Sequence, residues 1–331
     1  MDGSRGFALV QDTMEEALLF RQKMAQIEGQ VRRERLEERR WWFDTWQPKG
    51  DPDTLAELLE DVRSEAGAAT DDRTFARQLD FWTLRPGHSW HGFDKLGQGT
   101  VLLDPTKVTI LTPGLAPDGT ATPTGIPAAV VAAFLRARGI VVEKSGFYSF
   151  LVLFTLGITK GKSGSLLAEL LDFKAFYDAN APLARVFPHL VKRAPGTYQG
   201  LGLRDLCQQM HTHLQTTEIL SLANQIYARL PQPVITPAEA HRRLVEGQVK
   251  RVPISELVGC TSAVMVVPYP PGIPILIPGE QVTQETAAIR DYLLFFEEFN
   301  RNYPGFEVQL HGLSLETGAD GRGQHAPYCI S

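Results

Sequence analysis

Strand-like and helix-like stretches alternate between residues 99 and 177, and this alternation constrains the fold more than any other feature of the chain. Residues 99–114 hold β-branched and apolar runs closed by proline and glycine, which is typical of strands. Residues 125–139 have proline at the start of a helical pattern and glycine at its end. Apolar runs around residues 144–146 indicate two more strands, and residues 163–177 return to helical spacing. The pattern predicts helices interleaved with strands.

The N-terminal part of the chain has the pattern of one long amphipathic helix over residues 8–40. Its last section, residues 32–40, is RRERLEERR. Because both charge signs are mixed, this section indicates a solvated helix face with i,i+4 ion pairs rather than a patch for nucleic acid. The net charge of −5 gives no positive field toward nucleic acid or an anionic membrane. We expect neither as a partner.

Prolines at positions 182, 188 and 195 interrupt the pattern in the middle of the chain. A domain has about 150 residues, so a chain of 331 residues with 43% hydrophobic residues is expected to form two. The interruption predicts a boundary that separates residues 1–181 from residues 182–331. The second part has helical patterns at 203–229, 237–246 and 286–301 and strand-like runs at 263–267 and 306–311.

Three cysteines, Cys207, Cys260 and Cys329, are widely spaced and form no Cys-x-x-Cys pair. This argues against a disulfide framework or a zinc site and favours a reducing compartment. Acidic residues interrupt the N-terminal segment where a signal peptide needs an apolar run. No stretch reaches the roughly 18 apolar residues of a membrane span. We expect a cytoplasmic protein.

The segment GITKGKS, residues 157–163, follows an apolar strand and precedes a helix, as a phosphate-binding P-loop does. A P-loop needs glycine at the position of Leu156, whereas the glycine here is Gly157, so the loop is one residue short. We predict a tight strand-to-helix turn instead of a nucleotide site. The segment GLGLRD, residues 200–205, lacks the third glycine of a dinucleotide fingerprint and is interpreted as a helix cap.

Two histidine pairs, His88/His91 and His211/His213, are candidate metal ligands. His211 and His213 are at positions i and i+2, which face apart on a helix, and the chain has no Cys-x-x-Cys pair that would complete a zinc site. We expect no metal site. The chain also has no Gly-x-Ser-x-Gly nucleophile motif.

Long, ordered segments of the chain resemble the bacterial ornithine/lysine/arginine decarboxylases, which are large fold-type-I enzymes dependent on pyridoxal phosphate (PLP). The resemblance covers residues 8–312. Two positions depart from the family pattern, since Gly259-Cys260 replaces Gly-Arg and Ser163 replaces a tryptophan. The clearest similar segments are SWHGF (89–93), LLDPTKVTILTPG (102–114), GIPAAVVAAFLRARGIVVEKSGFYSFLVLFTLGITKGK (125–162) and AVMVVPYPPGIPILIPGE (263–280).

The resemblance implies an α+β fold. An aminotransferase-like small domain over residues 1–181, which includes the N-terminal helix, would be followed by the family's C-terminal domain over residues 182–331. It also implies that the complete enzyme holds PLP on a separate domain through the lysine of a Ser-x-His-Lys segment. None of the ten lysines of this chain follows a histidine. We therefore expect no catalytic or cofactor-binding residue here, and no decarboxylation by this chain alone.

Glu143, in VVEKSG, matches the family glutamate at the substrate entrance. A carboxylate at a strand end has the right charge to face the distal ammonium of lysine or ornithine. Alternatively, Lys144 or a surface arginine could pair with it. The resemblance also marks Trp90–Gly92 and the PYPPGIP turn at residues 268–274 as family signatures, which we interpret as rigid structural elements.

Two functions remain open at this point. In the first, the chain is part of a decarboxylase that converts lysine or ornithine to CO₂ and a diamine, cadaverine or putrescine, in polyamine metabolism. It would act with a PLP-domain polypeptide and form a homo-oligomer. In the second, the chain is a non-catalytic interaction or regulatory protein, or a decayed gene product, that docks on a full-length decarboxylase.

Overall fold

The computed structural model describes residues 3–48, 52–64, 78–97, 101–158, 161–269, 272–317 and 323–331. The chain divides into two compact units. Unit 1 comprises Met1–Val186 and Leu201–His211, and unit 2 comprises Phe187–Gly200 and Thr212–Ser331. Both units combine helices with small sheets, so the expected α+β class is confirmed. The domain boundary after residue 181 stays a prediction.

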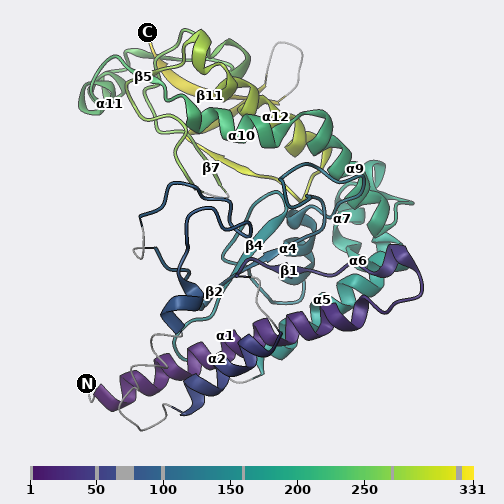
Figure 1. The fold of residues 1–331 in the computed structure, drawn as a ribbon. Coiled ribbons are helices and arrows are strands. Elements are labelled where there is room, and N and C mark those ends of the chain that lie inside the picture. The colour runs from purple at the N-terminus through teal and green to yellow at the C-terminus, as the bar shows by residue number, and fades with distance from the viewer. Residues whose placement is uncertain are drawn as a thin grey trace. The chain divides into compact units, whose positions relative to one another are not determined.

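Unit 1 is built on a four-stranded antiparallel sheet with the strand order β1-β2-β4-β3, of which Figure 1 labels β1, β2 and β4. Side chains alternate across the central strands, which buries Val108, Ile110 and Phe150. The strands are β1 (Asp44–Thr45), β2 (Lys107–Leu111), β3 (Lys144–Ser145) and β4 (Ser149–Leu153). The helices are α1 (Gly3–Val31), α2 (Pro52–Ser64), α4 (Ala128–Arg136), α5 (Lys162–Asp178) and α6 (Leu183–Val186).

Helix α4 confirms the signals expected at its ends. Pro127 is the N-cap residue, with a φ of −58° that suits the entry to a helix. Gly139 has a φ of +80°, which a residue without a Cβ adopts at low cost, and the chain leaves the helix there. The aromatic rings of Phe134 on α4 and Phe173 on α5 meet edge to face at 5.2 Å between centroids. This contact joins the two helices in the core of unit 1.

Helix α1 ends at Val31, so the prediction of a helix up to residue 40 is wrong at that end. The next apolar residue, Leu36, is five positions further on and 46% exposed, so it cannot continue the buried stripe. The charged residues 32–40 are exposed, as predicted, but only Glu37–Arg39 form a short 3₁₀ helix. The chain then buries Phe43 and enters β1.

A fully buried arginine fastens α1 to the sheet. Arg21 donates from Nε and Nη2 to the carbonyl oxygen of Pro105 at 3.2 Å, from Nη2 to that of Lys107 at 3.1 Å and from Nη1 to Oε1 of Gln47 at 2.8 Å. Burial lowers the pKa of Arg21. The hydrogen bonds to Gln47 and to the segment 105–107 thus replace those that the guanidinium would make with water. An apolar cluster joins α1 to α2, which lies beside it in Figure 1. The cluster consists of Leu18 of α1, of Leu55, Leu58, Leu59 and Val62 of α2, and of Trp82.

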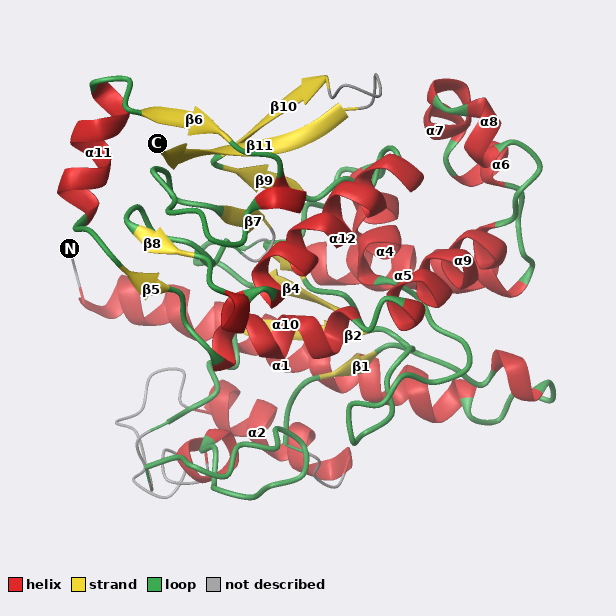
Figure 2. Cartoon of the chain, turned by 90° about the horizontal axis from the view of Figure 1, so that it is seen from above, coloured by secondary structure: helices red, strands yellow, loops and turns green. Residues whose placement is uncertain are grey.

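Unit 2 contains a three-stranded antiparallel sheet in which β11 pairs with both β10 and β6, and Figure 2 labels these strands. It also contains two strand pairs, β5-β8 and β7-β9. Its strands are β5 (Gln232–Pro233), β6 (Val249–Arg251), β7 (Val267–Tyr269), β8 (Glu280–Gln281), β9 (Gln309–His311), β10 (Leu313–Thr317) and β11 (Gly323–Ile330). Its helices are α7 (Pro188–Arg193), α8 (Pro195–Tyr198), α10 (Ile219–Ala228), α11 (Pro237–Val245) and α12 (Ala288–Asn302), and α9 (Leu203–Thr216) has residues in both units.

The predicted helical stretch at 203–229 is divided in two. Glu218 has a φ of +49°, a left-handed conformation that ends the regular helical path between α9 and α10. The hydroxyl of Thr217 donates to the carbonyl oxygen of His213 at 2.7 Å, which binds one of the last carbonyl groups of α9. Helices α11 and α12 confirm the predictions at 237–246 and 286–301.

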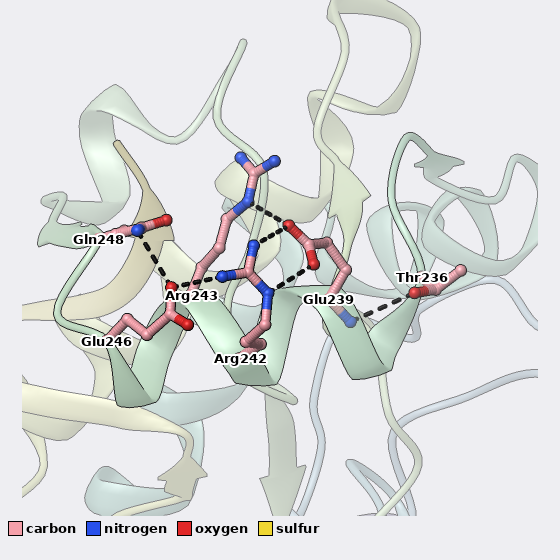
Figure 3. A network of polar contacts seen from close by, with 6 residues as sticks. All are labelled: Thr236, Glu239, Arg242, Arg243, Glu246 and Gln248. Atoms are coloured by element: carbon pink, nitrogen blue, oxygen red, sulfur yellow. Dashed lines mark hydrogen bonds and ion pairs between the residues drawn. The ribbon is translucent and has the colours of Figure 1, made fainter.

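Helix α11 has an exposed network of polar contacts (Figure 3). Its N-cap, Thr236, accepts a hydrogen bond from the backbone N–H of Glu239 at 3.2 Å. The Glu239 carboxylate accepts bonds from Arg242 and Arg243, and Arg242 also pairs with Glu246. The guanidinium of Arg242, followed by that of Arg243, lowers the pKa of Glu239 to about 2. Exposed pairs of this kind stabilise a helix weakly.

No helix in the described ranges is long and apolar enough to cross a membrane.

Candidate functional site

Glu143 directly precedes β3, the edge strand of the sheet in unit 1. Its backbone N–H donates to the carbonyl oxygen of Leu151 on β4 at 2.9 Å, which extends the pairing of the two strands. The side chain is exposed. Within the described part of the chain, its carboxylate forms no ion pair with Lys144 or an arginine. The carboxylate is therefore open to a cation that comes from outside the chain.

The turn between β3 and β4 is anchored by two residues that the sequence analysis did not connect. The hydroxyl of Tyr148 and Nδ1 of His211 on α9 are 2.6 Å apart, and Nε2 of His211 lies 2.7 Å from the carbonyl oxygen of Thr122. Because a carbonyl only accepts, Nε2 carries the proton, and Tyr148 donates to Nδ1. Burial raises the pKa of Tyr148, which keeps this donor protonated. The contact fixes the hairpin that begins beside Glu143.

Two glycines make room for this pair of rings. A Cβ atom on Gly125 would lie 2.2 Å from Nδ1 of His211, and one on Gly114 would lie 2.3 Å from Cε1 of Tyr148. Real Cβ atoms do not approach other atoms so closely, so larger residues would displace the rings. These glycines belong to the LTPG and GIP parts of the segments that carry the family resemblance. Glycine at these two positions therefore lets the backbone pass close to the rings of Tyr148 and His211.

The histidine pairs do not converge on common sites. His211 belongs to unit 1, whereas the ring of His213 packs against Phe295 and Phe299 in unit 2, at 5.5 and 5.9 Å between centroids. The rings of His88 and His91 are 6.1 Å apart, and Nδ1 of His91 accepts from the backbone N–H of Phe93. Throughout the described ranges, no group of three or more His, Cys, Asp and Glu side chains could hold a metal ion.

The serine of the GITKGKS segment forms a buried hydrogen bond within the protein. The hydroxyl of Ser163 donates to Oε2 of Glu16 on α1 at 3.0 Å, and both side chains are buried. Gly161, with a φ of +103°, precedes α5, while residues 159 and 160 lie outside the described ranges. The Ser163 hydroxyl therefore already donates to a carboxylate inside the protein. A negatively charged neighbour of this kind disfavours the binding of a phosphate.

The helix-cap interpretation of GLGLRD is confirmed. Oδ1 of Asn180 accepts from the backbone N–H of Arg204 at 2.9 Å, and Oδ2 of Asp205 accepts from that of Gly202 at 3.1 Å. These bonds use the free N–H groups at the start of α9.

The two family signatures differ in how much of them the structure describes. The ring of Trp90 lies 5.0 Å from that of Trp46 in an edge contact, which suits a structural role. In the PYPPGIP turn, residues 270 and 271 lie outside the described ranges, so the turn as a whole is not described.

The lysines that the structure describes do not fit a covalently held PLP, and Lys49 and Lys160 lie outside the described residues. Of the lysines that the structure describes, only Lys174 is buried. Its Nζ donates to the carbonyl oxygen of Arg39 and to Oδ2 of Asp178, both at 2.7 Å. An amine that forms a Schiff base must be neutral at the moment of reaction, whereas this ammonium is held by a carboxylate. No step of the chemistry is therefore assigned to a lysine of this chain.

Two family descriptions match the chain. Residues 1–162 match the major domain of the Orn/Lys/Arg decarboxylases, and residues 220–331 match their C-terminal domain. Lysine decarboxylase LdcA of Pseudomonas aeruginosa is 44% identical over 97% of this chain and 40% of its own length. The constitutive lysine decarboxylase of Escherichia coli is 37% identical over 94% of this chain and 39% of its own.

Solved structures of lysine decarboxylases also match almost the whole of this chain. Lysine decarboxylase A from Pseudomonas aeruginosa superposes with a TM-score of 0.84 at 43% identity, covering 98% of this chain and 40% of the other. The constitutive lysine decarboxylase of E. coli gives 0.80 at 35% identity, covering 98% and 41%. The chain thus spans about 40% of the length of the curated relatives it matches. The resemblance found in the sequence is confirmed, and the chain belongs to the Orn/Lys/Arg decarboxylase family.

Proposed function

We propose that these residues form part of a PLP-dependent decarboxylase that converts a basic amino acid, lysine or ornithine, to a diamine and CO₂. The observation that carries the proposal is the match of both family domains, in order, along one chain. Among the relatives, lysine decarboxylases reach 44% identity, compared with 37% for an arginine decarboxylase and 34% for an ornithine decarboxylase. We therefore favour lysine.

In this proposal Glu143 selects the basic side chain of the substrate. Its carboxylate is exposed and free of an internal ion pair in the described structure, and the Tyr148–His211 contact fixes the hairpin that begins beside it. An ammonium that meets a fixed carboxylate forms a charge-assisted hydrogen bond, which is stronger than a neutral one. The role of Glu143 would be to bind and orient the substrate rather than to transfer a proton.

PLP belongs to the complete enzyme in this proposal, where it supplies the electron sink for the loss of CO₂. The lysines that the structure describes do not fit the Schiff-base role, so we propose that a lysine outside these residues holds the cofactor covalently. The partner would be a PLP-domain polypeptide or a full-length decarboxylase, in a homo-oligomer. The three free thiols agree with our proposal of a reducing, cytoplasmic location.

The activity test compares three samples. The 331-residue chain is incubated with PLP and lysine or ornithine, first alone and then with a polypeptide that supplies a PLP domain with a Ser-x-His-Lys segment, and that polypeptide is also tested alone. We expect release of CO₂ only when the two polypeptides are combined. Release of CO₂ by the chain alone would contradict the cofactor argument. Stable binding to a full-length decarboxylase without any gain of activity would favour a regulatory protein.

The role of Glu143 is tested by Glu143→Gln in the combined enzyme. Loss of a charged hydrogen-bond partner costs about 1.5–3 kcal/mol, so we expect KM for lysine to rise roughly tenfold or more. Glu38→Gln is the matched control, because Glu38 is also an exposed glutamate of unit 1. An unchanged KM in Glu143→Gln, or an equal rise in both variants, would remove the assignment.

A further inference from the structure

The segment before β7 lies against the last strand of the chain in unit 2. Ser262 is directly opposite Cys329 of β11. The N–H of Ala263 donates to Tyr328 at 2.8 Å, and that of Ile330 donates to Thr261 at 2.9 Å. Bonds on both sides of the pair, but not between its members, identify Ser262 and Cys329 as a non-hydrogen-bonded pair, in which side chains lie closest.

Cys260 is on the same face of this ribbon as Cys329. It precedes Ser262 by two residues, and side chains two apart in an extended segment point the same way. The Cys260 thiol donates to the carbonyl oxygen of Glu256 at 3.4 Å, and its closeness contributes to the raised pKa of Cys329. Both cysteines are free. Two thiols that the proposed decarboxylation does not use are therefore diagonal neighbours on one face of the ribbon.

The two thiols differ in access. Cys329 is fully buried, whereas Cys260 is partly exposed. Burial, followed by the neighbouring Cys260, raises the pKa of Cys329 to about 12, so few of its sulfur atoms are thiolates at neutral pH. A reagent in solution therefore meets Cys260 first.

We propose that Cys260 and Cys329 are a reversible thiol–disulfide pair, with Cys260 as the reacting thiol and Cys329 as the resolving thiol. The oxidant is a low-molecular-weight disulfide such as glutathione disulfide. The Cys260 thiolate attacks one of its sulfur atoms, which forms a mixed disulfide and releases one thiol. Cys329 then loses its proton, and the small thiolate fraction that forms attacks the Cys260 sulfur and releases the second thiol. The two protons of the cysteines leave on the released thiols, and the oxidant gains the two electrons that the cysteines lose.

The backbone near Cys260 permits this closure. Diagonal neighbours on an antiparallel pair are about 7–8 Å apart, slightly more than the roughly 4.4–6.8 Å between the Cα atoms of a disulfide. Cys260 must therefore shift slightly. It follows Gly259, whose φ of +90° is a conformation that glycine adopts at low cost. The bond would tie β11 to residue 260, far from it in sequence.

The experiment maps thiols in the folded 331-residue chain. The protein is incubated with glutathione disulfide, the remaining thiols are alkylated in denaturant, and the chain is digested and analysed by mass spectrometry. We expect one linked peptide pair containing Cys260 and Cys329, alkylated Cys207, and loss of the link after dithiothreitol. Cys207→Ala, the matched control, should keep the link, and Cys260→Ser should lose it while Cys329 stays reduced.

Three results would overturn the proposal. They are a stable glutathione adduct on Cys260 without resolution, a link between the Cys260 residues of two chains, and unmodified thiols at oxidant concentrations that oxidise a model dithiol. Cys329→Ser should convert the internal link into the stable glutathione adduct. If that variant does not fold, peptide mapping of the parent and of Cys260→Ser still decides, because Cys260 is only partly buried.

Discussion

The contact between Tyr148 and His211 gives the sharpest test of how unit 1 is held together. Tyr148→Phe removes only the hydroxyl, so the ring still fills its place and no large cavity forms. Nδ1 of His211 then loses its donor at 2.6 Å in a site where the histidine has 0% exposure. An unsatisfied buried polar group costs about 1–3 kcal/mol. We expect the free energy of unfolding to fall by that amount.

The assay is urea unfolding followed by far-UV circular dichroism. Tyr328→Phe is the matched control, because the Tyr328 hydroxyl accepts a bond from Arg251 at 2.7 Å in an exposed position. We expect this control to change the free energy of unfolding by less than about 0.5 kcal/mol. His211→Leu and the double variant complete a cycle, in which directly bonded residues should show a coupling of roughly 0.5–3 kcal/mol. Equal effects of Tyr148→Phe and Tyr328→Phe, or no coupling, would refute the reasoning.

Two further predictions concern stability. Arg21→Met should destabilise the chain by about 3–5 kcal/mol, because three oxygen atoms lose the buried guanidinium that binds them. Arg63→Met, at an exposed ion pair, should cost less than about 1 kcal/mol in the same urea titration. Glu239 has a folded pKa of about 2, below the roughly 4.3 of an unfolded glutamate, so its ion pairs stabilise the fold above pH 4.3 and this contribution disappears as the pH falls toward 2. Unfolding midpoints of Glu239→Gln and the parent should therefore differ slightly at pH 6 and converge at pH 2; a difference that persists at pH 2 would contradict the assignment.

Elements with local signals could be predicted from the sequence. Pro127 and Gly139 mark the two ends of α4, and the spacing of residues 163–177 marks α5. The end of α1 could also have been found, because Leu36 breaks the apolar spacing. The hairpin of β10 and β11 could not. β11 contains Pro327, a residue that disfavours strands. It also pairs with β6, where Tyr328 is opposite Arg251, a residue distant in sequence.

The candidate site likewise depends on contacts between residues that are distant in sequence, which local patterns do not reveal. Glu143 was found through its match to the family, and its open carboxylate fits the predicted role without testing it. Tyr148 and His211 were missed because they are 63 residues apart and neither has a distinctive neighbour. His211 was considered only as half of a histidine pair, whereas its two ring nitrogens bind Tyr148 and Thr122. Gly114 and Gly125 were the available signal, since a glycine beside a bulky buried ring indicates a forced close approach.

The polar attachments of α1 limit where the polypeptide can be divided for expression in pieces. Arg21 binds the carbonyl oxygen atoms of Pro105 and Lys107, and Glu16 binds Ser163 at the start of α5. In a fragment that begins at β1, the carbonyl groups of Pro105 and Lys107 would lose Arg21, and the hydroxyl of Ser163 would lose Glu16. Shortened versions of this protein should therefore retain α1, and a supplied peptide with the sequence of α1 should restore the fold of a chain from which it has been removed.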